Sequence, residues 1–210
     1  MASIERTSPL DTWAERLGRA SANPAAFSIR ALAFMSQVNL RGNAADAGFA
    51  TAARGALGFD LPLAANTCST AASRAALWLG PDEWLIVDVP DRGDAIAQSL
   101  RGALAGMRKS VTDVSAARCV IEISGADARL VLAKGCPLDM HAGAFAPPQC
   151  AQTLLAKARV IIQCMDATPR FRLFVPDSFA AYLAEWLTDA AAECAATRGA
   201  GLEDIASRLA

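Results

Sequence analysis

The same residue pattern occurs twice in this chain, 83 residues apart, and this repeat limits the folds that the chain can adopt. Leu40–Asn43, at the end of one strand pattern, corresponds to Ile123–Ala126, at the end of another. Asp94 and Asp177, each placed to begin a helix, have the same separation. We infer an internal duplication, so the chain is expected to fold as two similar units.

The first helix of each half also ends in a similar way. Gly58–Leu63 reads GFDLPL and Gly135–Met140 reads GCPLDM, and a cysteine follows later in each connection, Cys68 and Cys150. Gly135 is expected to end its helix in a left-handed conformation, as glycine often does at this position. A long connection therefore follows the first helix of both halves.

Hydrophobic periodicity predicts the elements within each half. In chain order they are a strand at Phe34–Arg41, a helix from Asn43 to Leu57, a hairpin at Arg74–Val89, a helix from Asp94, a strand at Cys119–Ser124, a helix at Ala126–Lys134, strands at Ala158–Met165 and Arg170–Val175, and a helix from Asp177 to Arg198. In the hairpin, a tight turn at Pro81 places Trp84 opposite Leu79 and Trp78 opposite Leu85.

Each half thus has the order strand–helix–long connection–strand–turn–strand–helix. This is the β-α-β-β-α part of a ferredoxin-like unit, and the predicted fold class is α+β. Residues 1–24 are expected to form an N-terminal arm, with Leu10, Trp13 and Leu17 at helical spacing. Residues 25–110 form the first half, and residues 111–210 form the second half, in one compact unit with the first.

The composition fits a folded protein and argues against several partners. Hydrophobic residues make up 53% of the chain, the net charge is −1, and the basic residues are scattered, so no nucleic-acid surface is predicted. The apolar run Ala31–Met35 is far shorter than the roughly 20 residues of a membrane-spanning helix. The N-terminal residues have no signal-peptide core. We therefore expect a cytoplasmic protein without a membrane partner.

The segment Gly135–Cys150 gathers residue types that serve in metal binding and in catalysis. It contains Cys136, Asp139, Cys150 and His141, the only histidine of the chain. Zinc sites commonly use two close ligand pairs, whereas only Cys136 and His141 form such a pair here. Cys–His catalysis needs the two side chains in hydrogen-bond contact, which their spacing does not ensure. A turn region with a surface histidine is the favoured interpretation, and no metal ligand is assigned.

Other catalytic signatures are absent from the sequence. It has no phosphate-binding loop, no dinucleotide-binding glycine pattern after a strand and no nucleophile elbow. Asp82 and Glu83 form an acid–base candidate, although solvated turn carboxylates are the favoured alternative. The six cysteines, Cys194 among them, contain no C-x-x-C pair and are expected to be buried, reduced thiols. No catalytic or cofactor-binding residue is assigned to this chain.

Three stretches resemble a known family. Leu77–Val87 (LWLGPDEWLIV), Ser110–His141 and Phe145–Gln163 are similar to the gamma subunit of heterotetrameric sarcosine oxidase. The similarity extends from about residue 25 to residue 195. The L-W-L-G-P-D-E-W and G-C-P-L-D stretches are its most specific parts.

The resemblance implies that this chain is one part of a larger enzyme. The family's complex oxidises sarcosine to glycine with oxygen, giving hydrogen peroxide and formaldehyde or methylene-tetrahydrofolate. It carries FAD, FMN and NAD in its alpha and beta subunits and zinc in its delta subunit, with tetrahydrofolate as a further ligand of the complex. The gamma chain is expected to have a non-catalytic, structural role beside the alpha subunit. The resemblance also implies a fold like the folate-binding domain of the glycine-cleavage aminomethyltransferase.

Two functional hypotheses follow from this resemblance. In the first, the chain is the structural gamma subunit, and Trp13, Trp78 and Trp84 are candidate interface residues, although each could equally belong to the core. In the second, the chain is a free-standing tetrahydrofolate-binding or one-carbon-transfer protein of the same fold. A related folate-binding protein of iron–sulphur cluster maintenance shares Lys134–Cys136, but Pro137 departs from its motif, which argues against a thiol-dependent role for Cys136.

Overall fold

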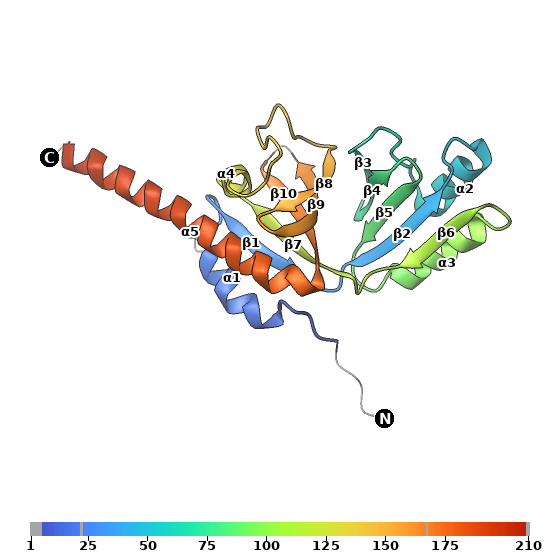
Figure 1. The fold of residues 1–210 in the computed structure, drawn as a ribbon, viewed down its shortest axis with the longest axis horizontal. Coiled ribbons are helices and arrows are strands. Elements are labelled where there is room, and N and C mark those ends of the chain that lie inside the picture. Colours follow the sequence, from blue (N-terminus) through green and yellow to red (C-terminus); the bar gives the residue numbers. More distant parts are fainter. Residues whose placement is uncertain (1–5, 22, 167, 209–210) are drawn as a thin grey trace, which may run out of the picture.

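The computed structural model contains two five-stranded antiparallel sheets, placed side by side with helices on their outer faces (Figure 1). It describes residues 6–21, 23–166 and 168–208, and in the last helix the side chains up to Ala192. Sheet A has the strand order β1-β7-β10-β9-β8, and sheet B has the order β3-β4-β5-β2-β6. The strands are β1 (Ser28–Leu32), β2 (Ser36–Gly42), β3 (Cys68–Ala71), β4 (Arg74–Gly80), β5 (Glu83–Asp88), β6 (Lys109–Asp113), β7 (Arg118–Ser124), β8 (Cys150–Leu155), β9 (Ala158–Asp166) and β10 (Arg170–Pro176).

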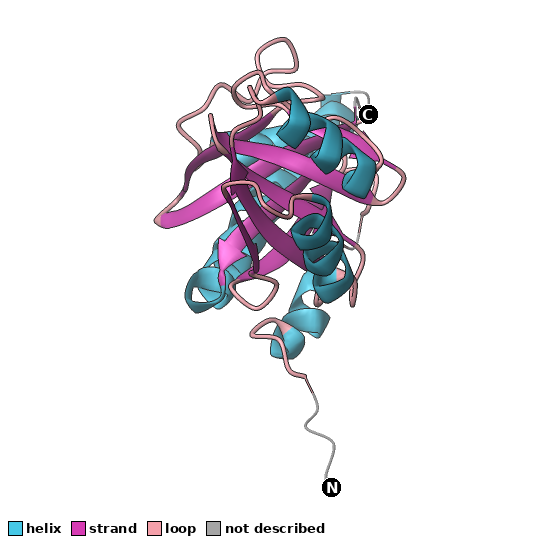
Figure 2. Cartoon of the chain, turned by 90° about the vertical axis from the view of Figure 1, so that its right-hand side faces the viewer, coloured by secondary structure: helices cyan, strands magenta, loops and turns pink. Residues whose placement is uncertain are grey.

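Two helices, α2 (Ala47–Leu57) and α3 (Gly93–Ala103), cover the outer face of sheet B, as the turned view in Figure 2 shows. The carboxylate of Asp46 begins α2 by accepting hydrogen bonds from the backbone N–H groups of Gly48 and Phe49. Gly58 ends it with φ 89°, the left-handed conformation that glycine adopts at low cost. Apolar side chains of both helices pack against the sheet in one cluster, which includes Phe49 of α2 and Trp84 of β5.

Sheet A carries the remaining helices, and the N-terminal arm belongs to its core. The short 3₁₀ helix η1 (Asp11–Trp13) and α1 (Ala14–Ala20) pack beside α4 (Ala128–Ala133) and α5 (Asp177–Arg208), and α5 extends well beyond the sheets in Figure 1. Leu10 and Leu17 are almost fully buried there, so the predicted helical spacing of the arm is confirmed. None of the described helices combines the length and hydropathy that a bilayer-spanning helix needs.

A third apolar cluster lies between the sheets. It joins Leu77 and Leu85 of sheet B to Val120 and Phe174 of sheet A, each at most 2% exposed. Because strand side chains alternate between faces, the strands that supply these residues are apolar on both sides. This cluster packs the inner faces of the two sheets against each other.

The structure differs from the predicted elements in its strands. β1, β3, β6 and β8 were not predicted, so each sheet has five strands. β1 belongs by sequence to the first half, yet it pairs with β7 in sheet A, Ser28 lying opposite Ser124. The first half of the chain thus supplies an edge strand to the sheet of the second half.

Two local predictions are wrong. In the β4–β5 hairpin Trp78 lies opposite Trp84 and Leu77 opposite Leu85, because an irregularity between Trp78 and Gly80 shifts the register by one residue. Gly135 does not adopt a left-handed conformation. A Cβ atom at Gly135 would instead lie 2.5 Å from the Trp186 ring, so this glycine is required by close packing.

Candidate functional site

The candidate metal ligands of Gly135–Cys150 do not converge. Cys136 is buried in the core under sheet A, whereas Cys150 lies in the cluster between the sheets. His141 is exposed, and its Nδ1 accepts a hydrogen bond from the backbone N–H of Gly143 at 3.1 Å. Asp139 accepts the backbone N–H of His141 at 2.8 Å. Both side chains thus stabilise a local turn, and among the described residues no group of three or more potential ligands could hold a metal ion.

Cys68 and Cys150 meet where the edges of the two sheets approach each other. The backbone N–H of Cys68 donates to the carbonyl of Pro148 at 2.7 Å, and that of Cys150 donates to Asn66 at 2.9 Å. A hydrogen bond to Cys150, followed by burial, raises the pKa of the Cys68 thiol above its ordinary value. The same hydrogen bond lowers the pKa of the Cys150 thiol, and both side chains are buried in the apolar cluster between the sheets.

The carboxylates of Asp82 and Glu83 are paired with neighbouring side chains. Arg41 lies 3.5 Å from Asp82 and 3.8 Å from Glu83, measured between nitrogen and oxygen. The side-chain amide of Asn39 also donates to Glu83 at 2.7 Å. These contacts fix the β4–β5 turn on β2.

The three candidate tryptophans differ in exposure. Trp84 is fully buried, and its indole N–H donates to the carbonyl of Pro62 at 2.8 Å. It therefore belongs to the core and is not an interface residue, because a buried ring cannot reach a partner. Trp13 and Trp78 are half-buried, and the Arg16 guanidinium lies 4.2 Å from the ring centre of Trp13. These two remain candidates for a partner surface.

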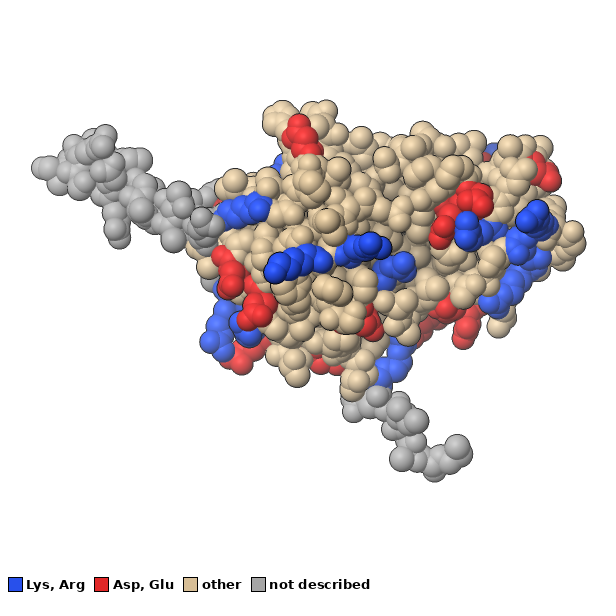
Figure 3. All heavy atoms as spheres, in the orientation of Figure 1, with Lys and Arg blue, Asp and Glu red and all other residues tan. Residues whose placement is uncertain are grey.

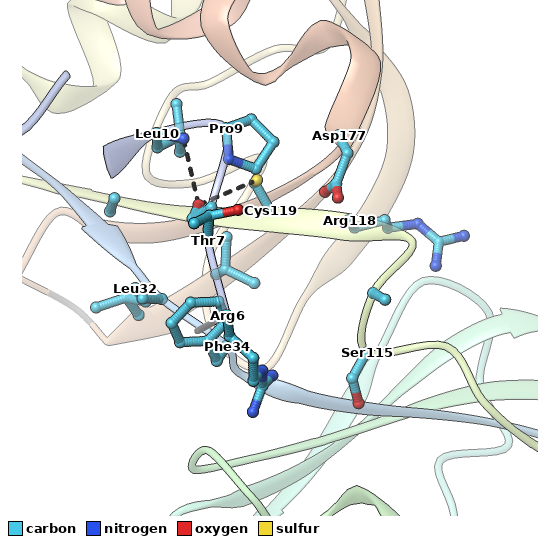
Figure 4. A pocket seen from close by; sticks show the side chains of 15 residues that line it. Arg6, Thr7, Pro9, Leu10, Leu32, Phe34, Ser115, Arg118, Cys119 and Asp177 are labelled. Atoms are coloured by element: carbon cyan, nitrogen blue, oxygen red, sulfur yellow. Dashed lines mark hydrogen bonds between the residues drawn. The ribbon is translucent and has the colours of Figure 1, made fainter. Parts of the chain in front are cut away.

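A small hollow of about 230 Å³ lies where the N-terminal segment crosses from one sheet to the other (Figure 4). Arg6 pairs with Asp91 at 2.7 Å and stacks 4.3 Å from the ring centre of Phe34, which ties the arm to the β5–α3 connection of sheet B. Burial, and then the nearby Asp177, raise the pKa of the Cys119 thiol to about 11. Cys119 is consequently protonated at neutral pH.

The start of α2, which follows the first strand of the duplicated pattern, does not suit a phosphate-bearing cofactor. Phosphates bind to free N–H groups at a helix N-terminus. Here the Asp46 carboxylate already accepts the N–H groups of Gly48 and Phe49. A second negative charge at this position would be repelled. The residues of this site therefore do not fit the FMN, FAD or NAD phosphates.

A larger groove, of about 760 Å³, lies on the face of sheet A that is turned toward sheet B. Its charged lining residues are Arg118 at the start of β7 and Arg159 near the start of β9. Sequence analysis did not single out either arginine. Each occupies a polar position beside an apolar strand run, and only the register of the sheet reveals that both face one groove.

Comparisons with known proteins agree with this architecture. The family model described as sarcosine oxidase, gamma subunit family matches residues 41–193. The chain is 38% identical over 196 residues to the sarcosine oxidase subunit gamma of Arthrobacter sp., covering 90% of this chain and 92% of that one. It is 35% identical over 191 residues to the subunit gamma of Corynebacterium sp. (strain P-1), with the same coverage.

Two solved structures are similar. A chain of the heterotetrameric sarcosine oxidase from Corynebacterium sp. U-96, solved with pyrrole 2-carboxylate, matches with a TM-score of 0.82 and 34% identity over 90% of this chain and 95% of that chain. The glycine cleavage system aminomethyltransferase T from Bartonella henselae matches with a TM-score of 0.61 and 17% identity, over 82% of this chain and 48% of that one.

The fold thus places this chain among α+β proteins with two antiparallel sheets that are built like part of an aminomethyltransferase. The sequence narrows this class further. The chain belongs to the sarcosine oxidase gamma subunit family, as its resemblance to that family predicts.

Proposed function

We propose that this chain is the gamma subunit of a heterotetrameric sarcosine oxidase and has a structural and assembly role there. The observation that carries the proposal is the similarity to a chain of such a complex, 34% identical over 90% of this chain and 95% of that chain. The complex would oxidise sarcosine, or a related N-methyl amino acid, to give glycine with hydrogen peroxide and formaldehyde or methylene-tetrahydrofolate.

In this proposal the chemistry takes place in partner subunits. FAD, FMN and NAD would be bound by the alpha and beta chains, zinc by the delta chain, and tetrahydrofolate elsewhere in the complex. The geometry of this chain supports such a division. The candidate carboxylates Asp82, Glu83 and Asp139 and the histidine lie in turns, and the thiols of Cys68, Cys136 and Cys150 are buried in apolar clusters. The complex would act in the cytoplasm, with the alpha chain as the most direct neighbour.

The half-buried tryptophans are the proposed contact points with the alpha chain. Trp13 packs against the core of sheet A and Trp78 against that of sheet B, and each keeps part of its ring accessible. Aromatic residues of this kind often anchor protein interfaces.

Co-expression of the chain with the other three subunits tests this proposal. One tagged subunit should retain the untagged gamma chain in constant proportion through affinity and size-exclusion steps. Trp13→Ala and Trp78→Ala should weaken this retention, whereas Leu63→Ala, at a side chain that is 68% exposed, serves as the control. A folded gamma chain that never elutes with the other subunits would refute the proposal.

We also propose that the two halves, 25–110 and 111–210, arose by duplication of a ferredoxin-like β-α-β-β-α unit, with 1–24 as an added arm. The order of four strands in each sheet supports this. The order β2-β5-β4-β3 in sheet B has the same connectivity as β7-β10-β9-β8 in sheet A, and only the fifth strand differs. In sheet A, β1 takes the place that β6 has in sheet B. The β-α-β-β-α pattern accounts for the three central strands of each sheet and leaves out the two outer ones.

A free-standing tetrahydrofolate-binding or one-carbon-transfer protein is the second candidate. It is favoured by the fold match to aminomethyltransferase T. Titration of the isolated chain with tetrahydrofolate in a calorimeter separates the two candidates. Saturable heat and a rise in Tm would support this second function, and their absence at high ligand concentration would remove it.

A further inference from the structure

The groove on sheet A is built from two rows of side chains that cross four strands. Strand register places Arg118, Pro176, Arg159 and Leu154 in the outer row. The next row inward contains Val120, Phe174, Ile161 and Gln152. The groove therefore has a largely apolar floor, and both arginines lie in its outer row, on either side of Pro176. Figure 3 shows several basic side chains in a row across the middle of the molecule, in the view of Figure 1.

The two arginines lack carboxylate partners. Arg118 is half-buried and Arg159 is exposed, and among the described residues no hydrogen bond or ion pair joins either guanidinium to another side chain. Figure 4 shows the Arg118 side chain pointing away from the small hollow near the N-terminal segment. The negative charge of Glu83 acts on the Arg118 guanidinium, but Asn39 and Arg41 already bind that carboxylate.

Burial without a partner is unfavourable for Arg118. It lowers the pKa of the Arg118 guanidinium below its ordinary value, and the charge of Glu83 only partly offsets this effect. A carboxylate supplied from outside would compensate the charge and would gain a charge-assisted hydrogen bond.

The rim of the groove offers backbone hydrogen bonds as well. β8 is the last strand of sheet A. The N–H of Cys150 donates outward, to Asn66, rather than to β9. Because successive residues of a strand alternate, the backbone groups of Gln152 and Leu154 also point to this outer edge. Leu154 is 45% exposed, which is high for a large apolar side chain beside an open strand edge.

We propose that this groove binds an extended segment of a partner subunit that carries acidic and apolar side chains. This inference rests on the proposed role of the chain in an oxidase complex. The segment lies along the edge of β8, its backbone pairing with Gln152 and Leu154, while a carboxylate reaches Arg118 or Arg159. Its apolar side chains cover Leu154 and the groove floor.

Three features together select a polypeptide as the occupant. The unpaired strand edge recognises a peptide backbone, the exposed leucine recognises an apolar side chain, and the two arginines recognise carboxylates. Another basic region, formed by Arg41, Arg108 and Lys109, also lies at a sheet edge, that of β6, but has only part of this combination. It contains Asp82 and has no large apolar side chain in its lining. That region therefore provides a matched control.

Site-specific photo-crosslinking in the assembled complex identifies the occupant. A benzophenone amino acid replaces Leu154 in one sample and Leu130 in another, since Leu130 lies on α4 and is 54% exposed. After irradiation, mass spectrometry should find a peptide rich in Asp or Glu from another subunit attached at position 154. A crosslink to a segment without acidic residues, or none in an intact complex, would overturn the proposal.

Charge reversal provides the second measurement. Arg118→Glu combined with Arg159→Glu should weaken retention of the gamma chain by the other subunits at least about tenfold. The reason is that the two glutamates would repel the carboxylates of the proposed acidic segment, which the two arginines attract. Arg108→Glu should change retention less than about twofold. Thermal unfolding of each purified variant verifies that the chain is folded.

The outcomes separate this inference from the proposed function. If the wild-type chain and both charge variants are retained equally at every salt concentration, the groove is not the contact and only this inference fails. If even the wild-type chain is not retained, the proposed function fails together with it. Selective loss in the double variant, with an acidic crosslink at position 154, supports both.

Discussion

Gly135 presents the most direct test of the packing described above. It follows α4, and its carbonyl accepts the N–H of Ala156 at 2.9 Å. In Gly135→Ala, the new Cβ would lie 2.5 Å and 2.8 Å from two carbons of the Trp186 ring and 3.1 Å from the nitrogen of Ala156. Ordinary carbon contacts are about 3.5–4.0 Å, so the ring must move by roughly 1 Å.

This displacement should destabilise the protein measurably. Overpacking of a well-packed core costs about 1–3 kcal/mol, and for a chain of this size 1 kcal/mol corresponds to about 2–4 °C in Tm. At about 2 kcal/mol, Gly135→Ala should lower Tm by about 4–8 °C. Urea titration and thermal unfolding, both followed by circular dichroism, measure the change.

A matched glycine and a second substitution make the test specific. Gly55 lies exposed in α2, and a methyl group added there would have no neighbouring atom within 4 Å, so Gly55→Ala should stabilise by about 0.5–1 kcal/mol. Trp186→Leu makes room for the methyl of Gly135→Ala, so the double variant should be more stable than the sum of the single effects predicts, by about 1 kcal/mol. Strict additivity, or a Gly135→Ala protein as stable as wild type, would refute the reasoning.

Three further predictions concern side chains whose environments are equally well defined. Trp84→Phe leaves a cavity and an unpaired carbonyl at Pro62, so unfolding should require about 2–4 kcal/mol less free energy, measured by urea titration; an unchanged midpoint contradicts the burial. Burial raises the pKa of Glu122, but hydrogen bonds from Arg30 and Arg172 outweigh burial and hold that pKa below 4.5. Glu122→Gln should therefore cost about 3 kcal/mol of folding free energy at pH 7. Wild type should lose this contribution as the pH falls below 4.5 through the folded-state pKa, whereas the variant has no such contribution to lose. Parallel profiles of stability against pH for the two proteins would argue against this explanation. His141→Ala should leave metal content and the oxidase activity of the assembled complex nearly unchanged, and a clear loss of either would restore a chemical role to His141.

Sequence patterns predicted the elements whose signals are local. The strand within Phe34–Arg41, the glycine after α2 and the start of α5 at Asp177 each depend on neighbours within a few turns. Within these elements β2 begins only at Ser36, because Phe34 lies in a turn with φ 57°, and α5 continues beyond the predicted Arg198 to Arg208. Cys119, Ile121 and Ile123 share the face that alternation assigned to them. Such patterns are dictated by strand and helix geometry, so they survive any tertiary arrangement.

The missed features depend on distant or irregular contacts. β1 is short and gains its stability from β7, with Arg30 and Glu122 92 residues apart in the chain. The hairpin register failed at Leu79, because one bulged residue moves all later pairs. Of the candidate site, the local turn at His141 was predicted, whereas the Arg118–Arg159 groove required knowledge of strand order. The side chain of Cys194 lies outside the described residues.

The place of β1 has a consequence for synthesis on the ribosome. The first strand of the chain emerges long before the strand it pairs with, and a delay of 92 residues corresponds to roughly 5–20 s at ordinary elongation rates. During this interval Phe27 and Ile29 have no sheet to cover them. Sheet B can assemble as soon as β6 has emerged. Sheet A can be completed only when β7 to β10 have followed and β7 has paired with the much earlier β1. β1 is therefore made well before the strand that holds it in the sheet.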